Sequence, residues 1–305
     1  MTAANSTDFQ AYLESICSDE KYLGWQDFYT PTDALHRQRI EKKQPPRRLN
    51  LSLMVQTIVA PPETEAPGEE KPEKEQVERL EVLAGLRKYA DNHLLLVGKP
   101  GSGKSTALER LLWEEAEKGR GAGERQTKIP VLVQLRYYQT SVLDLIRSFL
   151  KQHGLLLEIT KIEQLLFEQK FLLLVDGLNE LPSEDARLSL IAFRRENAAT
   201  PMIFTTRELA GDIGIEKKLE MQPLTEAQMR QFVLTYLPEE GELLLKQLQG
   251  RLRELGETPL LLWMLCEEFN NTGNIPPNLG SLFCRFTQSY GSQIKQDGGN
   301  SETCG

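Results

Sequence analysis

The chain has 305 residues, of which 40% are hydrophobic and 26% charged, so it is long enough for two or three domains with hydrophobic cores. Its net charge of −8 argues against a protein that mainly grips nucleic acid through phosphates, and we expect no nucleic-acid partner. No apolar stretch approaches the roughly 18 residues of a membrane span, and the first ten residues lack signal-peptide character. The sequence therefore predicts a cytoplasmic protein. Four cysteines and three histidines are scattered without metal-ligand spacing, which argues against a zinc site.

The first 60 residues are predicted to form an N-terminal module of unknown function. Four apolar residues near the N-terminus share one face of a predicted helix, which indicates core packing, although an exposed aromatic docking surface stays open as an alternative. They are Phe9, Tyr12, Leu13 and Ile16. Residues 51–58 alternate in a way that fits a strand or a short helix.

Residues 61–76 are rich in proline and acidic side chains. Such a segment cannot bury enough apolar surface to order itself. We therefore predict an extended linker that divides the N-terminal module from the rest of the chain. A basic run over residues 36–48 is interpreted as a solvated helix end followed by a proline turn, with contact to RNA, DNA or an acidic partner as the alternative.

Residues 98–106 read GKPGSGKST, which matches the phosphate-binding pattern G-x-x-x-x-G-K-[ST]. An apolar run over 93–97 predicts a buried strand before this loop, and residues 107–113 have helical spacing after it. Glycines let the loop turn its N–H groups inward at a helix N-terminus, where anions bind. Lys104 is expected to bind the β- and γ-phosphates and to act in catalysis, and Ser105 to bind Mg²⁺. The predicted nucleotide-binding residues of the loop are Gly98, Lys99, Pro100, Gly101, Ser102, Gly103, Lys104, Ser105 and Thr106.

A second apolar run, from residue 171 to 175, ends abruptly in Asp176. An unbroken apolar run is typical of a parallel strand covered by helices, and functional groups gather at the carboxyl ends of such strands. Asp176 is therefore predicted to hold Mg²⁺ together with Ser105, usually through water. Glu180 is predicted to orient or deprotonate an attacking water. The alternative for Glu180 is a capping or solvated loop carboxylate before Pro182.

A third strand is predicted over residues 201–206, and Arg207 follows it. An arginine at this edge can sense the γ-phosphate and neutralise charge in the transition state. The alternative is a surface ion pair with Glu208 or Glu180, which is worth roughly 0 to 1 kcal/mol.

Further strands are predicted over 129–135 and over 218–222, the latter as an edge strand, with helices over 141–153 and 161–169 between the motifs. This alternation predicts an α/β fold of three layers, a P-loop NTPase with about five mainly parallel strands. After Pro223 the strands stop, and Thr225 with Gln228 forms a capping box that opens a small all-helical subdomain. We predict the nucleotide-binding domain over 77–223, the helical subdomain over 224–290 and a disordered tail over 291–305.

With these motifs in order, the chain resembles the NACHT family of signal-transducing P-loop ATPases, a branch of the STAND NTPases. The resemblance is carried by residues 98–106, by DGLNE at 176–180 and by ETPLLLWML at 257–265, and it covers about residues 77–290. It implies that Pro259 packs on the nucleotide base. Read from the residues alone, Thr258 is a helix N-cap and Pro259 the first helical residue. Family members often carry a second acid where this chain has Asn179, which implies a metal pocket with one negative charge fewer.

Within the family the chain is most similar to bacterial NACHT proteins whose C-terminal halves are HEAT-like helical repeats. The resemblance implies a slow, Mg²⁺-dependent ATPase switch that holds ATP or ADP, in bacterial defence or stress signalling, with a protein partner or self-oligomer and no membrane. The chain ends in a polar, glycine-rich stretch before such repeats, so we expect a truncated product, a fragment or a subunit that borrows its sensor.

Three other functions are weighed against this hypothesis. A nucleotide-dependent binding scaffold would hold ATP or ADP with negligible hydrolysis and recruit a partner through the N-terminal module. A small-molecule P-loop kinase is disfavoured by Glu180 and by the lack of an arginine-rich lid. A GTPase is less favoured because no N-K-x-D segment is present to read guanine, although the resemblance allows GTP in some members.

Overall fold

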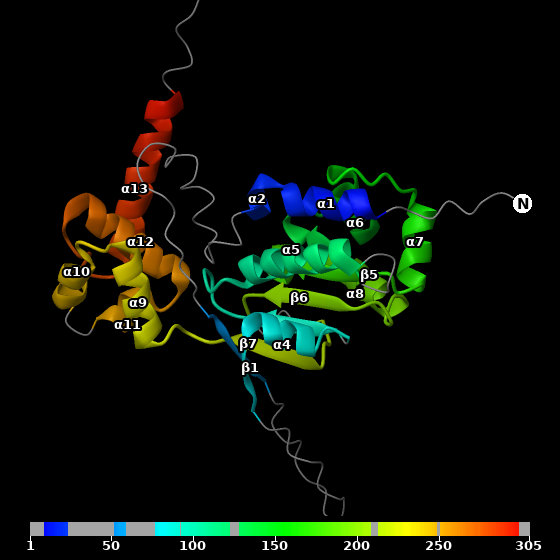
Figure 1. The fold of residues 1–305 in the computed structure, drawn as a ribbon, viewed down its shortest axis with the longest axis horizontal. Coiled ribbons are helices and arrows are strands. Elements are labelled where there is room, and N and C mark those ends of the chain that lie inside the picture. The colour runs from blue at the N-terminus through cyan, green and yellow to red at the C-terminus, as the bar shows by residue number, and fades with distance from the viewer. Residues whose placement is uncertain are drawn as a thin grey trace, which may run out of the picture. The chain divides into compact units, whose positions relative to one another are not determined.

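The computed structural model of this chain describes residues 9–23, 52–58, 77–91, 93–122, 128–208, 213–248 and 251–298. The chain divides into two compact units, an α/β unit that ends at Gln222 and a helical unit that begins at Pro223 (Figure 1). Three loop residues, Gly101–Gly103, group with the second unit. Within the described ranges no helix is both long enough and apolar enough to cross a membrane.

The α/β unit is built on one sheet with the strand order β2-β1-β7-β3-β6-β5-β4. Its strands are β1 (Met54–Thr57), β2 (Arg79–Glu81), β3 (Leu94–Val97), β4 (Ile129–Gln134), β5 (Phe171–Asp176), β6 (Met202–Thr206) and β7 (Lys217–Met221). The five strands from β7 to β4 run parallel, whereas β1 is antiparallel to both β2 and β7. The predicted α/β class with about five mainly parallel strands is confirmed. Strands β3 and β6 are buried at every residue, as expected of parallel strands covered on both faces.

Helices alternate with these strands along the chain, and serine caps mark two of the helix starts. The helices of the unit are α1 (Gln10–Ser18), α2 (Glu20–Leu23), α4 (Val82–Lys88), α5 (Lys104–Ala122), η2 (Leu135–Tyr137), α6 (Val142–Gln152), α7 (Ile159–Phe167), η3 (Leu178–Glu180) and α8 (Glu184–Glu196). The side chains of Ser141 and Ser183 accept hydrogen bonds from N–H groups in the first turns of α6 and α8.

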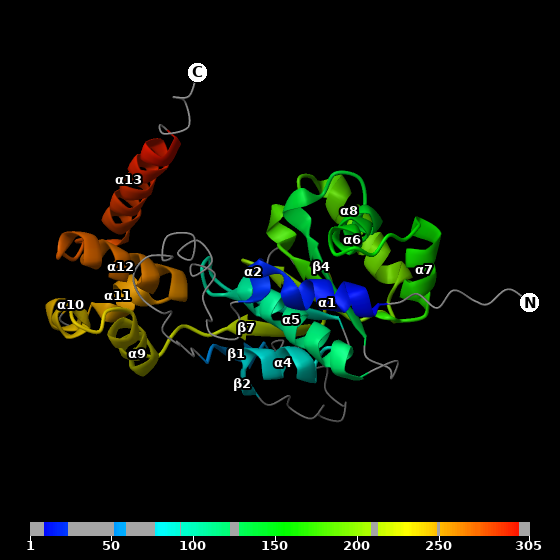
Figure 2. The ribbon, with the colours of Figure 1, turned by 45° about the horizontal axis from the view of Figure 1, so that its top comes forward.

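The structure differs from the prediction of a separate N-terminal module over residues 1–60. Helix α1 lies along α5 (Figures 1 and 2), and Tyr12, Leu13 and Ile16 are buried, which confirms the core-packing interpretation for these three residues. The Tyr12 hydroxyl donates a hydrogen bond of 2.7 Å to the carbonyl of Pro130 on strand β4. Strand β1 settles the strand-or-helix alternative for residues 51–58. Residues 9–18 and 54–57 are therefore part of the α/β unit.

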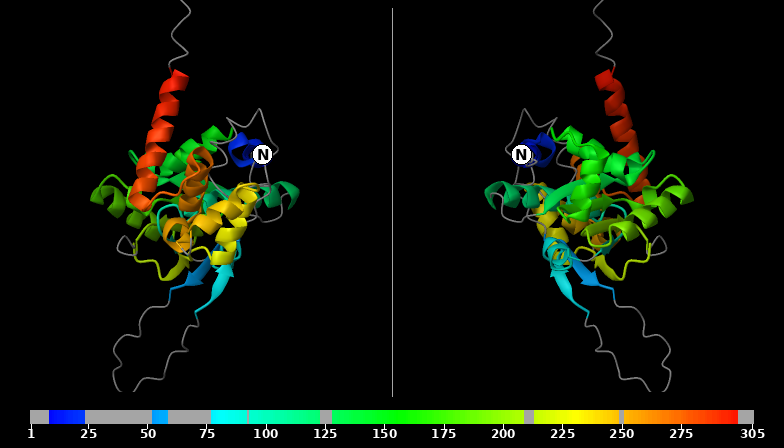
Figure 3. Two further views of the ribbon diagram at one scale, coloured as in Figure 1. Left: turned by 90° about the vertical axis from the view of Figure 1, so that its left-hand side faces the viewer. Right: turned by 90° about the vertical axis from the view of Figure 1, so that its right-hand side faces the viewer.

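The predicted linker over 61–76 lies outside the described residues, but the chain on either side of it is paired. Strands β1 and β2 are antiparallel neighbours, with Val55 opposite Leu80 (Figure 3). The segment therefore connects two strands of one sheet instead of dividing two modules. Strand β7 was predicted at the edge, and this is wrong: β1 pairs with it, so β7 lies between β1 and β3. Its polar residues are accessible even inside the sheet, since its two lysines are half-buried and its glutamate is exposed.

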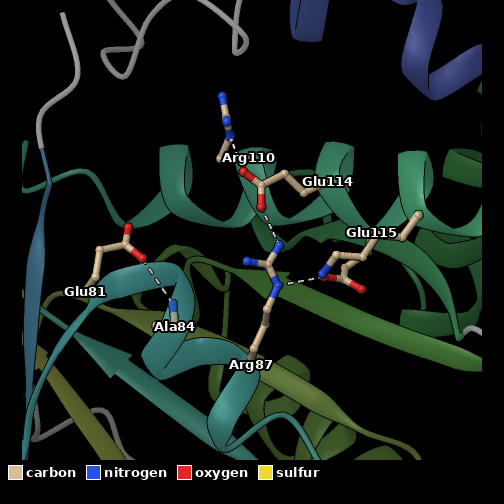
Figure 4. A network of polar contacts seen from close by, with 7 residues as sticks. Glu81, Ala84, Arg87, Arg110, Glu114 and Glu115 are labelled. Carbon is tan, nitrogen blue, oxygen red and sulfur yellow. Dashed lines mark hydrogen bonds and ion pairs between the residues drawn. The ribbon is translucent and has the colours of Figure 1, made fainter.

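Helix α4 is joined to the loop-following helix α5 by a charged network (Figure 4). Arg87 of α4 donates to Glu114 and, at 2.9 Å, to Glu115, and Arg110 donates to Glu114 at 2.6 Å. Glu81 caps the start of α4. Because the four network side chains are only about one fifth to one third exposed, the network is less screened than an ordinary surface pair.

The helical unit contains α9 (Glu226–Tyr236), α10 (Gly241–Leu248), α11 (Leu252–Gly256), α12 (Pro259–Thr272) and α13 (Leu279–Gly298). The predicted capping box is confirmed, since Thr225 and Gln228 bond reciprocally. Helix α13 continues to Gly298, beyond the predicted start of a disordered tail at residue 291. Its first half packs on α12 through Phe286 against Trp263 and through Arg285, which pairs at 3.4 Å with the buried Glu268.

Candidate functional site

The polar residues that the sequence singles out lie at the carboxyl ends of three neighbouring parallel strands. Strand β6 lies between β3, which leads into the glycine loop, and β5, which ends in Asp176. Because the strands are parallel, their carboxyl ends meet at one edge of the sheet. The loop, Asp176 and Arg207 are thereby brought to the same edge.

The glycine loop leaves β3 and enters α5 with the backbone conformation that the pattern predicts. Gly98 donates its N–H to the carbonyl of Thr206 at 3.3 Å, which fixes the loop start to β6. Gly101 and Gly103 have φ angles of +74° and +95°, which glycine adopts readily and other residues avoid. Helix α5 begins at Lys104, directly after the loop. The N-terminus of a 19-residue helix therefore faces the loop, and its free N–H groups can bind an anion.

Lys104 is held against the loop by its own backbone. Its ammonium donates to the carbonyls of Gly98 and, at 3.0 Å, Lys99, and the residue is only 9% exposed. Burial lowers the pKa of Lys104 to about 8, with Asp176 opposing this shift. Among the described residues this buried ammonium donates to neutral carbonyls alone, so it is poised to bind a phosphate, which offers it a full negative charge.

Ser105 and Asp176 lie in direct contact, as the metal-site prediction requires. The Ser105 hydroxyl donates to Asp176 Oδ1 at 3.0 Å, and the hydroxyl of Thr205 on β6 donates to the same oxygen at 2.6 Å. Hydroxyl and carboxylate oxygens are ligands that Mg²⁺ prefers. Within the described part of the chain no three His, Cys, Asp or Glu residues gather as a metal site. A cation here would therefore take its other ligands from phosphate and water, as Mg²⁺ commonly does.

Glu180 is placed by the turn that follows Asp176. Gly177 has a φ of +87°, and its N–H donates to Thr205 at 2.8 Å, while the Glu180 N–H donates back to the Gly177 carbonyl at 2.8 Å. A Cβ on residue 177 would lie 2.9 Å from a carboxylate oxygen of Glu180. Glycine at this position therefore permits both the left-handed turn and the approach of the Glu180 side chain.

Arg207 and Glu180 form an ion pair of 3.5 Å, with side chains 53% and 33% exposed. The ion-pair interpretation of Arg207 is thus correct for this structure. A partly exposed pair of this kind is worth roughly 0 to 1 kcal/mol, so a phosphate could displace the carboxylate at little cost. The backbone N–H of Arg207 donates to the side-chain oxygen of Asn179 at 3.2 Å. Phosphate sensing by Arg207 stays a prediction.

The remaining predicted residues divide by burial. Lys99 and Pro100 are exposed, whereas Ser102 and Thr106 are buried, and their hydroxyl oxygens lack a hydrogen-bond partner among the described residues. Buried hydroxyls without a partner, one in the glycine loop and one in the first turn of α5, fit a site that a polar ligand completes. Pro259 is the first residue of α12 in the helical unit, and Thr258 caps that helix, so both structural interpretations are confirmed. Contact between Pro259 and a nucleotide base stays a prediction.

Sequence reasoning missed Thr205 and the role of Asn179. Both side chains bond groups at the site: Thr205 lies outside the patterns that single out the loop, Asp176 and Glu180, whereas Asn179 lies within the 176–180 motif but is singled out there only as the replacement of an acid. The available signal was the pair of threonines directly before Arg207, at the end of a strand whose other residues are apolar.

A mainly parallel sheet with a lysine-bearing glycine loop after one strand and an acid at the end of another defines a nucleotide-binding P-loop NTPase module. Residues 92–240 match the family model described as NACHT domain. The predicted resemblance to the NACHT family is confirmed over this segment by that match.

No curated protein matches the chain. Among solved structures it is similar to Drosophila ORC bound to DNA, with 15% identity, a TM-score of 0.40 and coverage of 63% of this chain and 55% of that one. It is also similar to the replication initiator DnaA bound to AMPPCP and single-stranded DNA, with 12% identity, a TM-score of 0.39 and coverage of 64% of this chain and 60% of that one. For C. elegans PCH-2 the identity is 12%, the TM-score 0.39 and the coverage 70% of this chain and 66% of that one. The chain thus spans less than two thirds of each of these chains. At these TM-scores the likenesses carry no argument about function, and the absence of a nucleic-acid partner stays a prediction from charge alone.

Proposed function

We propose that this chain binds ATP with Mg²⁺ and hydrolyses it slowly, as the core of a NACHT-type signal-transduction switch. The observation that carries the proposal is the meeting of three kinds of group at one sheet edge. A phosphate-binding cation, Lys104, lies beside the oxygen pair of Ser105 and Asp176, and Glu180 with Arg207 completes the edge. Phosphoryl transfer to water needs groups that bind the phosphates, groups that hold the metal and a group that activates the water.

Each residue has a role that its surroundings support. Lys104 and the loop N–H groups bind the phosphates, and Ser105 and Asp176 hold the cation. Bound Mg²⁺ would neutralise phosphate charge and fix the orientation of the phosphates. Glu180 accepts a proton from the attacking water, and its partial exposure leaves room for that water. Arg207 leaves Glu180 for the γ-phosphate, so that the ion pair re-forms when the phosphate departs.

Protein partners belong to the same proposal, since a switch has to report its nucleotide state to another protein or to a second copy of itself. The preference for ATP over GTP rests on the missing guanine-reading segment. A scaffold that binds nucleotide without turnover uses the same loop and the same metal site. The two functions differ only in whether Glu180 acts.

Turnover therefore tests the proposal. Purified protein is denatured, the released nucleotide is identified by chromatography, and phosphate release from added ATP is followed beside the Glu180→Gln variant. We expect bound ADP or ATP and a slow hydrolysis that this substitution lowers by about 10²- to 10⁴-fold, the usual contribution of a general base. ATP binding should persist, because glutamine keeps the shape of the side chain.

Glu184→Gln is the matched control, since Glu184 lies four residues further on in α8 with a side chain that is 75% exposed. Its turnover should equal that of the unmodified protein. Bound nucleotide with no turnover in any variant would establish the scaffold instead. Retention of tight nucleotide binding in Lys104→Ala would overturn the site assignment itself.

A further inference from the structure

We propose that Thr205 is a positioning residue whose hydroxyl holds Asp176 in its metal-binding orientation and couples that carboxylate to the strand that ends in Arg207. The inference rests on the proposed function, because it concerns the metal that the reaction uses. It assigns a role to a side chain outside the loop and outside the acidic motif.

The hydrogen bonds of Thr205 fix the direction of its proton. Its oxygen accepts the N–H of Gly177 at 2.8 Å, and an amide N–H can only donate. The single hydroxyl proton is then directed to Asp176 Oδ1, 2.6 Å away. This is a short hydrogen bond to a group that is an acceptor when ionised, and such bonds are roughly twice as strong as neutral ones. Thr205 thus holds Asp176 Oδ1 in one orientation at the end of the strand.

Thr205 and Ser105 bond the same oxygen, but their surroundings differ. Ser105 is exposed and, at 3.0 Å, makes the longer bond, so its hydroxyl can turn from Asp176 to a cation. Thr205 is 1% exposed, and among the described residues its hydroxyl bonds no side chain other than Asp176. When Ser105 turns to the metal, Thr205 is the donor that keeps Asp176 in place. A group that does not touch the metal but hydrogen-bonds one of its ligands fixes the orientation of that ligand in this way.

The same strand end also contacts the other two parts of the site. The carbonyl of Thr206 accepts the N–H of Gly98 at the loop start, and the N–H of Arg207 donates to Asn179, the residue before Glu180. The last two residues of β6 and Arg207 directly after them therefore bond the metal-binding acid, the loop and the segment that carries Glu180. A displacement of this strand end alters all three together, so phosphate contact at Arg207 and metal binding at Asp176 are coupled.

The test compares Thr205→Val with Thr205→Ser. Valine keeps the shape and removes the hydroxyl, whereas serine keeps the hydroxyl. Each full-length variant is titrated with a fluorescent ATP analogue in Mg²⁺ and in EDTA, and Mg²⁺ is titrated at fixed nucleotide. We expect Thr205→Val to raise the Mg²⁺ concentration for half-maximal binding by about 10- to 100-fold, as loss of an outer partner of a metal ligand does. Affinity in EDTA should hold, and Thr205→Ser should keep most of the wild-type Mg²⁺ response.

Thr200→Val is the matched control. Thr200 is also 1% exposed and its hydroxyl also donates a buried hydrogen bond, at 2.8 Å to the carbonyl of Leu166, but it precedes β6 at the opposite end of the strand. Its loss of stability should resemble that of Thr205→Val, while its Mg²⁺ titration should match the wild type.

The outcomes separate this inference from the proposed function. An unchanged Mg²⁺ titration in Thr205→Val overturns the inference, as does an equal loss in Mg²⁺ and EDTA or an equal shift in Thr200→Val. If the unmodified protein binds no nucleotide, or binds it as well after Lys104→Ala, the proposed function fails first, whatever Thr205 does.

Discussion

Lys104 offers a prediction in which binding and stability oppose one another. Burial lowers the pKa of its ammonium from 10.5 to about 8. Because each pKa unit is worth about 1.4 kcal/mol, the difference of 10.5 − 8 corresponds to about 3 kcal/mol by which folding disfavours the charged form. Lys104→Met removes the charge and also the two hydrogen bonds to loop carbonyls, which cost about 1 kcal/mol each. We expect the variant to raise the free energy of unfolding of the nucleotide-free protein at pH 7 by about 1 to 2 kcal/mol, by the same principle.

The sign of the pH dependence follows from the same pKa. The folded-state pKa of Lys104 lies below that of the unfolded chain, so between about pH 8 and 10.5 the unfolded state binds more protons. The stability of the wild type therefore rises relative to the variant as pH rises through this window. The advantage of Lys104→Met is present in full below about pH 8 and is lost toward pH 10.5.

Urea unfolding of nucleotide-stripped protein, followed by tryptophan fluorescence near neutrality and at mildly alkaline pH, measures both effects. Lys99→Met is the control, since Lys99 lies in the same loop with an exposed side chain. The difference in free energy of unfolding between Lys99→Met and the wild type should not shrink as the pH rises. A Lys104→Met variant less stable than the wild type at neutral pH, or a gap of equal size at both pH values, would refute the reasoning. Nucleotide binding should be lost in Lys104→Met in either case.

Two further predictions concern how N-terminal elements pack on the α/β unit. In Gly85→Ala the new Cβ would lie 2.8 Å from a methyl group of Val55, so we expect overpacking to lower stability by about 1 to 3 kcal/mol in calorimetry, whereas Gly121→Ala, with nothing within 4 Å, should stabilise its helix. Tyr12→Phe leaves the buried carbonyl of Pro130 without its 2.7 Å donor and should cost about 1 to 3 kcal/mol in urea unfolding. An unchanged midpoint in either variant contradicts the packing described.

The parts of the molecule that the sequence predicts are those fixed by local pattern. A glycine loop, a strand ending in Asp176 and a capping box at Thr225 each depend on residues within a few positions of one another. The five parallel strands follow from apolar runs of ordinary length for the same reason. Strand β2 was missed because three residues of partly exposed strand carry almost no periodic signal.

Placement across the sheet could not be predicted in this way, because it depends on pairing between distant segments. Residues 54–57 read equally well as strand or helix, and only their pairing with β7 decides the matter. The acidic stretch over 61–76 has the composition of a linker between domains, yet paired strands flank it. Composition reports whether a segment can bury surface, but says nothing of how close its two ends lie.

The strand order also explains why the site is more connected than its motifs. If β3 and β5 were neighbours, Ser105 and Asp176 could still meet, but the end of β6, which Arg207 follows, would not lie between the two strands. With β6 inserted, Gly98 at the loop start, Asp176 and Asn179 are each bonded to one of three consecutive residues, Thr205 to Arg207. Thr205 and Thr206 are buried, and close-packed residues of this kind rearrange in discrete steps more readily than they deform gradually. Loss of a phosphate from Arg207 should therefore alter the environment of Asp176 in one step, and this is the property that a nucleotide switch requires.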